Sequence, residues 1–263
     1  MQLAEERRQH IVDTVERHGK VLAAELAQRF NTSEDTIRRD LRDLDAAGLL
    51  RRVHGGAMRR TRAEPGFAQR LDADAARKAM LARALADSVQ PGDTVLVDAG
   101  TTNLAFVRLL DDGRAAAIVT NSPQIALGLG HLRATRVVLL GGTYSAHSGA
   151  VLGAQTVAEI QRLRVNLAIV GVCSVEADRG LGASDAEEAV VKQAMLAAGS
   201  RRVVAALNDR LEAPAPFLIA PLGEIDRLVL EADAAPSVLA RLRRGERAPE
   251  IVLAAPVAGK GRA

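Results

Sequence analysis

Three polar or glycine-rich stretches in the middle of the chain each follow an apolar run rich in β-branched residues. They are Asp98, Gly100, Thr101 and Thr102, then Thr120, Asn121 and Ser122, and finally Gly141 and Gly142. Hydroxyls and backbone N–H groups at a helix start can hold an anion such as phosphate, and a carboxylate accepts hydrogen bonds from sugar hydroxyls. One such stretch alone is typical of an ordinary turn, but the recurrence indicates a small-molecule site.

A possible charged partner for that site lies further along the chain. Glu188 and Lys192 are four residues apart, so a helix would place them on one face. This spacing is also typical of a plain surface ion pair. We expect the ammonium of Lys192 to hold a phosphate and the carboxylate of Asp98 to accept sugar hydroxyls. If Asp98 or Glu188 were instead a base for proton transfer, the chain would be a sugar-phosphate isomerase, which is the alternative function.

Basic residues concentrate near the N-terminus. Residues 1–62 carry a net charge of +3, the remaining residues carry none, and residues 36–62 hold eight arginines against three aspartates. The arginines expected to face outward from one helix are Arg38, Arg39 and Arg42. Arginine pairs with O6 and N7 of guanine and also holds phosphates, and the hydroxyls of Ser33 and Thr36 at the helix start suit a phosphate oxygen. A solvated surface has similar charge, so composition alone does not decide.

Composition narrows the class of protein. The 263 residues are 48% hydrophobic and 25% charged, which is typical of a globular chain of one or two domains. Aromatic residues make up only 2%, which weighs against a carbohydrate-stacking lectin and against an aromatic single-strand binder. Cys173 is the single cysteine, and no apolar run reaches the ~20 residues of a membrane span. We therefore expect a cytoplasmic protein without membrane anchor, metal or cofactor.

Apolar spacing near the N-terminus predicts three short helices. They are Leu3–His18, a segment carrying Leu22, Leu26, Ala27 and Phe30 on one face, and a third helix with the buried stripe Ile37, Leu41 and Leu44. The polar turn Asn31–Ser33 offers oxygens to cap the third helix, with Asp35 three residues after Thr32. An extended run, Leu49–Val53, then closes at Gly55–Gly56. Helices joined by a brief turn and followed by a basic hairpin describe a winged helix-turn-helix.

After residue 78 the sequence alternates between buried strands and helices. The strands expected are Thr94–Asp98, Ala116–Val119, Arg136–Leu140, Leu167–Gly171, Arg202–Leu207, Arg227–Leu230 and Ile251–Ala254. The helices expected are Lys78–Val89, Thr102–Leu110, Gln124–His131, Gln155–Leu163, Glu187–Ala198 and Pro236–Arg243. Such alternation predicts an α/β domain with a mostly parallel sheet covered on both faces. In these sheets ligands bind beyond the carboxyl ends of the strands, where the three polar stretches fall.

The N-terminal residues carry a family resemblance. The stretch Glu34–Leu41, followed by Leu44, Gly48–Leu49 and Arg52–Ala57, resembles the signature of the DeoR family of bacterial transcriptional regulators. The resemblance implies that Ser33–Ala46 is the recognition helix and that the wing carries further DNA contacts. The wing residues concerned are Arg51, Arg52 and His54. For His54, contact with DNA and packing of the turn are equally open, and Leu22 departs from the family in lacking a polar side chain to cap the second helix.

The rest of the chain resembles the sensor domain of the same family, which has a ribose-5-phosphate-isomerase-like fold. The matching pieces are Asp98–Thr102, Thr120–Ser122, Gly141–Gly142, Gly149, Gly153, Gly171 and Glu188–Lys192 with Met195. The resemblance implies a phosphorylated sugar or related effector held by the first two loops. The family commonly has Asp-x-Ser-Lys after the fifth sensor strand, whereas this chain has Leu207–Arg210. Arg210 would replace that lysine as a phosphate donor with a different geometry.

These observations predict four segments. Residues 1–57 form the winged helix-turn-helix domain, 58–77 a linker, 78–255 the effector-binding sensor domain and 256–263 a flexible tail. The expected function is a non-enzymatic repressor of a sugar or polyol operon, acting as a dimer or higher homo-oligomer on double-stranded operator DNA and released by its effector. Besides the isomerase, a DNA-binding architectural protein with a purely oligomerising second domain is an alternative.

Overall fold

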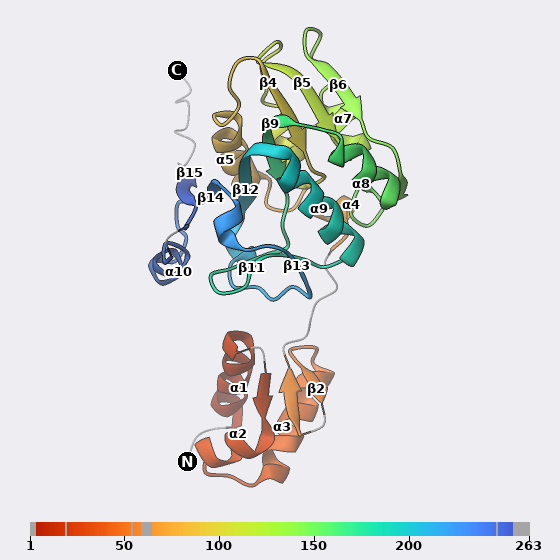
Figure 1. The fold of residues 1–263 in the computed structure, drawn as a ribbon. Coiled ribbons are helices and arrows are strands. Elements are labelled where there is room, and N and C mark those ends of the chain that lie inside the picture. The colour runs from red at the N-terminus through yellow and green to blue at the C-terminus, as the bar shows by residue number, and fades with distance from the viewer. Residues whose placement is uncertain (1–3, 19, 54, 59–64, 246, 255–263) are drawn as a thin grey trace, which may run out of the picture. The chain divides into compact units, whose positions relative to one another are not determined.

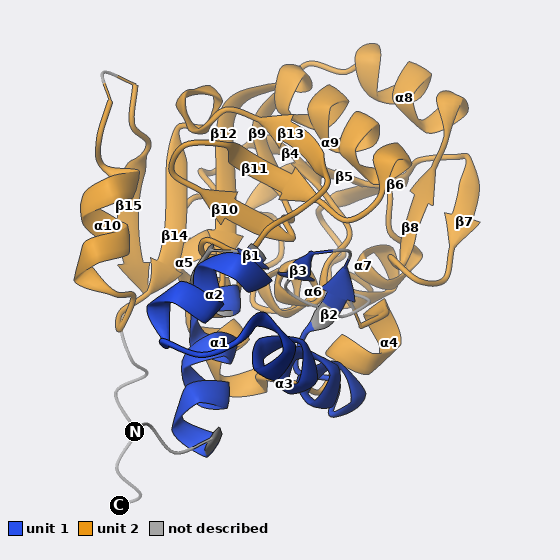
Figure 2. Cartoon of the chain, turned by 90° about the horizontal axis from the view of Figure 1, so that it is seen from below, with its two compact units in different colours: residues 1–64 blue, residues 65–263 orange. Residues whose placement is uncertain are grey.

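The chain folds into two units, traced in Figure 1 and coloured separately in Figure 2. The computed structural model describes residues 4–18, 20–53, 55–58, 65–245 and 247–254. Unit 1 covers Met1–Glu64 and unit 2 covers Pro65–Ala263. The fold class is the predicted one: a small helical unit with a wing precedes an α/β unit built on a parallel sheet.

Unit 1 contains three helices and a small antiparallel sheet. The helices are α1 (Ala4–His18), α2 (Ala23–Arg29) and α3 (Glu34–Ala46), and the strands β1 (Lys20–Leu22), β2 (Arg51–Val53) and β3 (Gly56–Met58) pair in the order β1-β3-β2. The predicted stripe of α3 is buried together with Ile11 and Val15 of α1 and Leu26 of α2. Gly56 is required where β3 meets β1, since a Cβ there would lie 2.0 Å from the carbonyl oxygen of Val21.

One local expectation for unit 1 was wrong and another is confirmed. Leu22 does not join the apolar face of the second helix, because it ends the short strand β1 and is 50% exposed. It is the N-cap residue of α2, and no side-chain hydrogen bond caps that helix. The polar turn Asn31–Ser33 does cap α3, through Ser33, whose hydroxyl accepts the N–H of Thr36 at 3.2 Å.

Unit 2 is built on a seven-stranded parallel sheet. Its order is β15-β14-β12-β9-β4-β5-β6. In chain order the strands are β4 (Asp93–Val97), β5 (Ala115–Thr120), β6 (Arg136–Leu139), β9 (Val165–Val170), β12 (Gly199–Ala206), β14 (Arg227–Glu231) and β15 (Glu250–Ala254). Each of the seven predicted strands is present, because a strand buried on both faces is recognisable as a short continuous apolar run.

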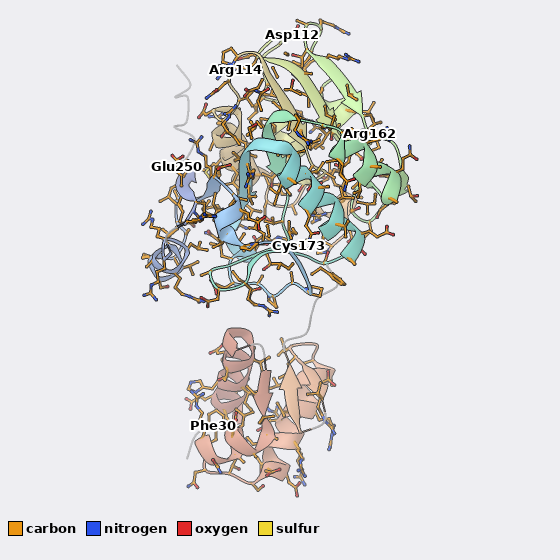
Figure 3. All side chains as sticks on the ribbon, viewed as in Figure 1. Phe30, Asp112, Arg114, Arg162, Cys173 and Glu250 are labelled. Atoms are coloured by element: carbon orange, nitrogen blue, oxygen red, sulfur yellow. The ribbon has the colours of Figure 1, made fainter. Side chains whose placement is uncertain are left out.

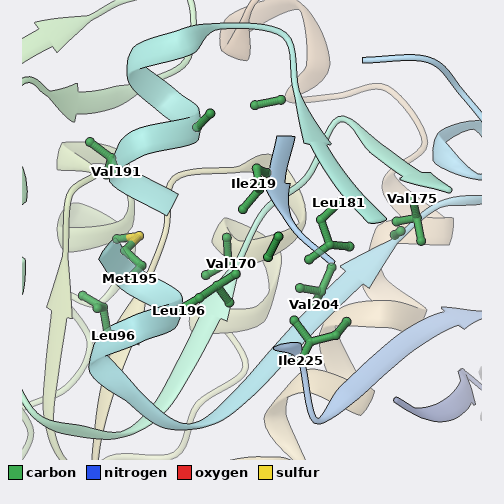
Figure 4. Packing of buried hydrophobic residues seen from close by; sticks show 14 of the residues in the cluster. Leu96, Val170, Val175, Leu181, Val191, Met195, Leu196, Val204, Ile219 and Ile225 are labelled. Atoms are coloured by element: carbon green, nitrogen blue, oxygen red, sulfur yellow. The ribbon is translucent and has the colours of Figure 1, made fainter. Parts of the chain in front are cut away.

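Helices cover both faces of this sheet. They are α5 (Ala75–Ala86), α6 (Thr101–Val107), α7 (Pro123–Gly128), α8 (Ala154–Gln161), α9 (Ala186–Ala198) and α10 (Pro236–Leu242). One apolar cluster joins the sheet to α8 and α9, with Leu96, Val170 and Met195 at its centre (Figure 4). A second cluster on the opposite face joins the sheet to α5, α6 and α7.

Several small elements were not predicted. A hairpin of β7 (Thr143–Ser145) and β8 (Ala150–Leu152) follows β6, and a separate antiparallel sheet joins β10 (Ser174–Glu176), β11 (Gly180–Ala183) and β13 (Phe217–Ala220). The 3-10 turns are η1 (Asn208–Arg210) and η2 (Leu222–Glu224). In the stretch expected as a linker, unit 2 already contains α4 (Phe67–Arg70) and the start of α5. The expected tail, 256–263, lies outside the described residues.

Candidate effector site and nucleic-acid interface

The arginines of α3 differ in what they contact. Arg38 donates to Glu34 at 2.8 Å and reaches Asp35 at 3.5 Å, so its charge is partly neutralised within the helix. Arg39 and Arg42 are exposed, and neither forms an ion pair within the described part of the chain. Ser33 and Thr36 share a hydrogen bond of 2.9 Å at the helix start. The outward-facing cations best suited to DNA are therefore Arg39 and Arg42.

The recognition helix is tied to α1 by a buried carboxylate. Asp40 accepts from Arg7 Nε at 2.7 Å and from Arg8 Nε at 2.9 Å, and Arg8 also reaches the exposed Asp43. The hydrogen bond from Arg8 to Asp40, together with both carboxylates, raises the pKa of the Arg8 guanidinium above its ordinary value. Asp40 thus sets the position of α3 on α1 and leaves the outer face of α3 to other residues.

The wing offers one described cation. Arg52 is exposed on β2, opposite Ala57 of β3. Arg51 belongs to the same strand, but its side chain lies outside the described part of the structure, and so does His54 altogether. Their expected contacts with DNA remain predictions.

In unit 2 the first two predicted polar stretches meet at Asp98, a buried carboxylate just beyond β4. Its Oδ2 accepts the N–H of Gly171 at 3.0 Å and an N–H of Lys192 Nζ, and its Oδ1 accepts from Asn121 Nδ2 at 3.3 Å. Its backbone carbonyl accepts from Asn103 Nδ2 at 2.8 Å. The structure therefore brings together Asp98, Asn121 and Lys192, which are up to 94 residues apart in sequence.

Lys192 is a buried cation between two carboxylates. It pairs with Asp98 and lies 3.7 Å from Glu188 one turn earlier on α9. Burial lowers the pKa of the Lys192 ammonium, but Asp98 and Glu188, with the nearby Cys173, outweigh that effect and raise it above the ordinary value. Lys192 is therefore charged, and its charge is already balanced inside the protein.

The loop after β5 links this cluster to the β7–β8 hairpin. Asn121 Oδ1 accepts the N–H of Ala99 at 3.0 Å, and its backbone carbonyl accepts from Val151 at 2.6 Å. Ser122 donates to the carbonyl of Gly149 at 2.9 Å, and the hydroxyl of Thr120 accepts the N–H of Ser122. These three side chains are buried and hold the loops in place.

Other predicted effector residues lie around the cluster. Thr101 and Thr102 begin α6 after Gly100, whose φ of +153° lies in a region that L side chains rarely adopt. Gly141 and Gly142 pack against α8 instead: Thr156 donates to the Gly141 carbonyl at 2.7 Å, and a Cβ on Gly142 would lie 2.2 Å from the Thr156 hydroxyl. The two glycines are thus explained by packing.

Arg210 follows β12 on turn η1, beside Asp209 at 3.5 Å. Its charge also acts on Lys78, whose pKa is lowered mainly by burial. Lys78 is buried and donates to the carbonyls of Arg70 and Ala73. Arg210 therefore stands in a basic neighbourhood at the carboxyl end of the sheet, while the buried Glu231 of the next strand pairs with Arg77 at 2.6 Å.

Sequence reasoning missed two neighbours of the cluster as functional candidates. Gly171 donates to Asp98. Cys173, labelled in Figure 3, is half-buried and close enough to Lys192 to act on its charge, with Sγ 3.6 Å from the Ser184 hydroxyl. Nothing in their spacing could identify them, since each is recognised only by its place beyond β9. In the described part of the chain no cluster of His, Cys, Asp and Glu side chains could hold a metal ion, and no helix is long and apolar enough to cross a membrane.

A winged helix-turn-helix followed by an α/β unit, with a polar cluster at the carboxyl end of its sheet, defines a DNA-binding regulator with a sensor domain. The comparisons with known proteins agree. The model of the DeoR-like helix-turn-helix domain matches residues 7–63, and that of the DeoR C-terminal sensor domain matches residues 73–232. The chain belongs to the DeoR family of transcriptional regulators.

Curated relatives span most of the chain. An uncharacterized HTH-type transcriptional regulator, FruR of Bacillus subtilis, is 33% identical over 73% of this chain and 76% of its own length. The repressor CsqR of Escherichia coli is 30% identical over 87% of both chains. The glycerol-3-phosphate regulon repressor of Escherichia coli is 30% identical over 73% of this chain and 76% of its own.

Solved structures match more weakly. Ribose 5-phosphate isomerase A from Neisseria gonorrhoeae has a TM-score of 0.40 at 14% identity, over 54% of this chain and 56% of its own. A probable sor operon regulator from Shigella flexneri also has a TM-score of 0.40, at 15% identity, over 62% of this chain and 87% of its own.

Proposed function

We propose that this protein is a cytoplasmic repressor of a sugar or polyol operon, released from its operator by a phosphorylated sugar or related effector. The observation that carries the proposal is the buried cluster of Asp98, Asn121 and Lys192 at the carboxyl end of the sheet, in one chain with the exposed Arg39 and Arg42. Relatives described as a glycerol-3-phosphate regulon repressor and a putative aga operon repressor support the effector class. A symmetric operator requires at least a dimer.

The contacts refine which groups would meet the effector. Asp98 and Lys192 already neutralise each other, so their role is to fix the loops beyond β4 and β9 around the ligand. The hydroxyls of Thr101 and Thr102 are the groups we assign to the ligand, since neither hydroxyl forms a hydrogen bond with the residues that the structure describes. Arg210, on turn η1 after β12, would supply the cation that binds a phosphate group of the effector.

The same geometry disfavours the isomerase alternative. A general base must reach the proton of a bound substrate and accept it. Both carboxylate oxygens of Asp98 accept hydrogen bonds from within the protein, one of them from the ammonium of Lys192. These contacts occupy the oxygens that would have to accept the proton of a substrate. A turnover assay with ribose 5-phosphate checks this directly.

A two-stage experiment tests the proposal. Full-length protein is screened by thermal shift against sugar phosphates, phosphorylated polyols and free sugars, and its operator is obtained by selection from random duplex DNA. A compound that raises the melting temperature should also release the selected DNA in a gel shift. Thr102→Val should bind the same DNA but lose release. If no compound of these classes binds, or if no DNA sequence is selected, the proposal is wrong.

A further inference from the structure

One edge of the parallel sheet ends in an exposed apolar strand. Strand β6 is the last strand on its side, and no described strand pairs with its outer edge (Figure 1). Val137 is 36% exposed and Leu139 is 48% exposed. Proteins usually protect such edges with charges, prolines or bulges, because an unpaired strand recruits another chain. On β6 the only charge is Arg136, at its start.

The open hydrogen-bonding groups of β6 can be identified. The N–H of Leu140 donates to Thr120 of β5 at 2.9 Å, so it points into the sheet. The backbone groups of alternate residues point to opposite sides of a strand. Those of Val138 and Arg136 therefore point toward β5 as well, and those of Val137 and Leu139 point outward.

A second copy of β6 can pair with the outer edge of this strand, running antiparallel about a two-fold axis at Val138. This pairing would give hydrogen-bond partners to the outward-pointing N–H and C=O groups of Val137 and Leu139. Val137 of each copy would exchange two backbone hydrogen bonds with Leu139 of the other, and the exposed side chains of that pair would cover each other. Because the axis is perpendicular to the sheet, the same face of both copies stays on the same side. The two sheets would continue as one.

The charges beside β6 are complementary in this register. Arg136 would stand opposite Leu140 of the other copy, on the face where Val138 packs toward α8. Glu159 of α8 lies next to that position, since it accepts the N–H of Gly141 at 2.9 Å. That hydrogen bond, with one from Gln155 and the charge of Arg162, lowers the pKa of Glu159 and keeps it ionised. Each copy thus offers a cation where the other offers an anion.

We propose that two copies of this chain associate through β6, with Arg136 of each facing Glu159 of the other. This interface depends on the proposed function in one respect, because the proposed function requires a dimer. Four-residue strands alone bury too little for a stable interface, which needs about 800 Å² from each partner. Helices α7 and α8 flank the strand on its two faces and supply the remaining area, including Leu127, which is 81% exposed.

Sedimentation of the full-length protein without DNA tests this surface. Val137→Lys should weaken dimerisation at least tenfold, because its charge would be buried against the apolar partner strand. Leu253→Lys is the matched control: it places the same charge, at a residue that is 39% exposed, on β15, the opposite edge strand, which begins at Glu250 (Figure 3). That variant should dimerise like the parent protein. Circular dichroism establishes that both variants are folded.

A charge exchange tests the register. Arg136→Glu alone should weaken the dimer by bringing two carboxylates together, and adding Glu159→Arg should restore it. A parent chain that is monomeric, a Val137→Lys variant that dimerises normally, or a dimer broken by Leu218→Lys on β13 instead would overturn the proposed surface. The gel shift with selected DNA is read separately, so these outcomes do not depend on whether the repressor function is correct.

Discussion

At the scale of single residues, Lys192 already has a buried carboxylate partner, Asp98, within the protein. The sequence predicts Lys192 as a phosphate donor, but the structure buries it against Asp98 and near Glu188. Removing one member of a buried pair leaves the other charge without compensation. The ammonium is therefore a poor target for testing effector binding alone.

Lys192→Met should accordingly destabilise unit 2 by roughly 3–5 kcal/mol, the usual cost of breaking a buried pair. Urea denaturation of the full-length protein measures it. The double variant Lys192→Met with Asp98→Asn should recover much of the loss, because neither charge is left alone. A single variant as stable as the parent would show that the pair is not buried in solution.

Two arginines of the recognition helix, Arg38 and Arg39, can be compared directly, because only Arg38 pairs with carboxylates of the same helix. Arg39→Ala should weaken operator binding by about 1–3 kcal/mol and relax specificity at one base pair if the guanidinium reads a base. Arg38→Ala is the matched control and should cost less, because Arg38 already pairs with Glu34 and Asp35. Titrations against the selected operator and single-base variants give both values. Equal losses for the two substitutions would contradict the assignment.

At the scale of elements, the buried parallel strands and the wing hairpin were predictable, and the other small antiparallel strands were not. Strands such as β9 consist of a continuous apolar run, which identifies them without knowing the neighbours. Strand β11 (Gly180–Ala183) contains two glycines, and β1 has three residues, so neither carries a periodic signal. Their pairing depends on partners distant in sequence, as in β11 with β13.

The features of the candidate site also divide into those that could be predicted from the sequence and those that could not. The loops after β4 and β5 could be predicted, because parallel strands bring their carboxyl ends to one edge. The contacts within it could not, since Lys192 and Asp98 are 94 residues apart and nothing local pairs them. The sequence also predicts the two-glycine turn after β6 as part of the site. In the structure a glycine is needed at position 142 for packing, because this residue approaches Thr156 closely.

Helix α4 connects the effector loops to the start of unit 2. Ser122 binds the carbonyl of Gly149, the N–H of Phe67 donates to His147 at 2.6 Å, and a Cβ on Gly149 would lie 2.6 Å from the Phe67 ring. Helix α4 begins at Phe67, shortly after unit 1 ends at Glu64. Contacts therefore link the loop after β5 to the first helix of unit 2, and we predict that α4 transmits a change in that loop.

Phe67→Ala should consequently leave effector affinity within about threefold of the parent and strongly reduce effector-driven release of DNA. The deleted ring removes the contact with the 147–149 turn but no group of the buried cluster. Gln69→Ala, on the same helix, removes only a hydrogen bond to the N–H of Gly66 and serves as the control. Paired calorimetry and gel shifts measure binding and release. Unchanged release in Phe67→Ala would exclude α4 from the coupling.

At the scale of the whole molecule, the distribution of charge and the symmetry of a dimer together predict how the protein binds DNA. The net charge of +3 belongs to residues 1–62, while the remaining residues are neutral overall. Electrostatic attraction to DNA therefore acts on unit 1. If the protein binds as a symmetric dimer, every wing contact occurs twice on one operator.

The salt dependence of binding can count those contacts. Each phosphate contact contributes about 0.9 to the slope of log affinity against log salt. Arg52→Ala should therefore lower the slope by about 1.8 for a dimer that places both wings on DNA, and by about 0.9 for a single wing. The affinity should fall by the same factor for operator and unrelated DNA, since a phosphate contact carries no sequence information.

Arg247→Ala, which changes an exposed arginine in unit 2, is the control and should leave the salt slope unchanged. Filter binding between 50 and 200 mM salt, roughly the range over which such slopes are resolved, measures it. A slope untouched by Arg52→Ala would remove the wing from the interface, and a drop near 0.9 would show that only one wing of the assembly contacts the DNA.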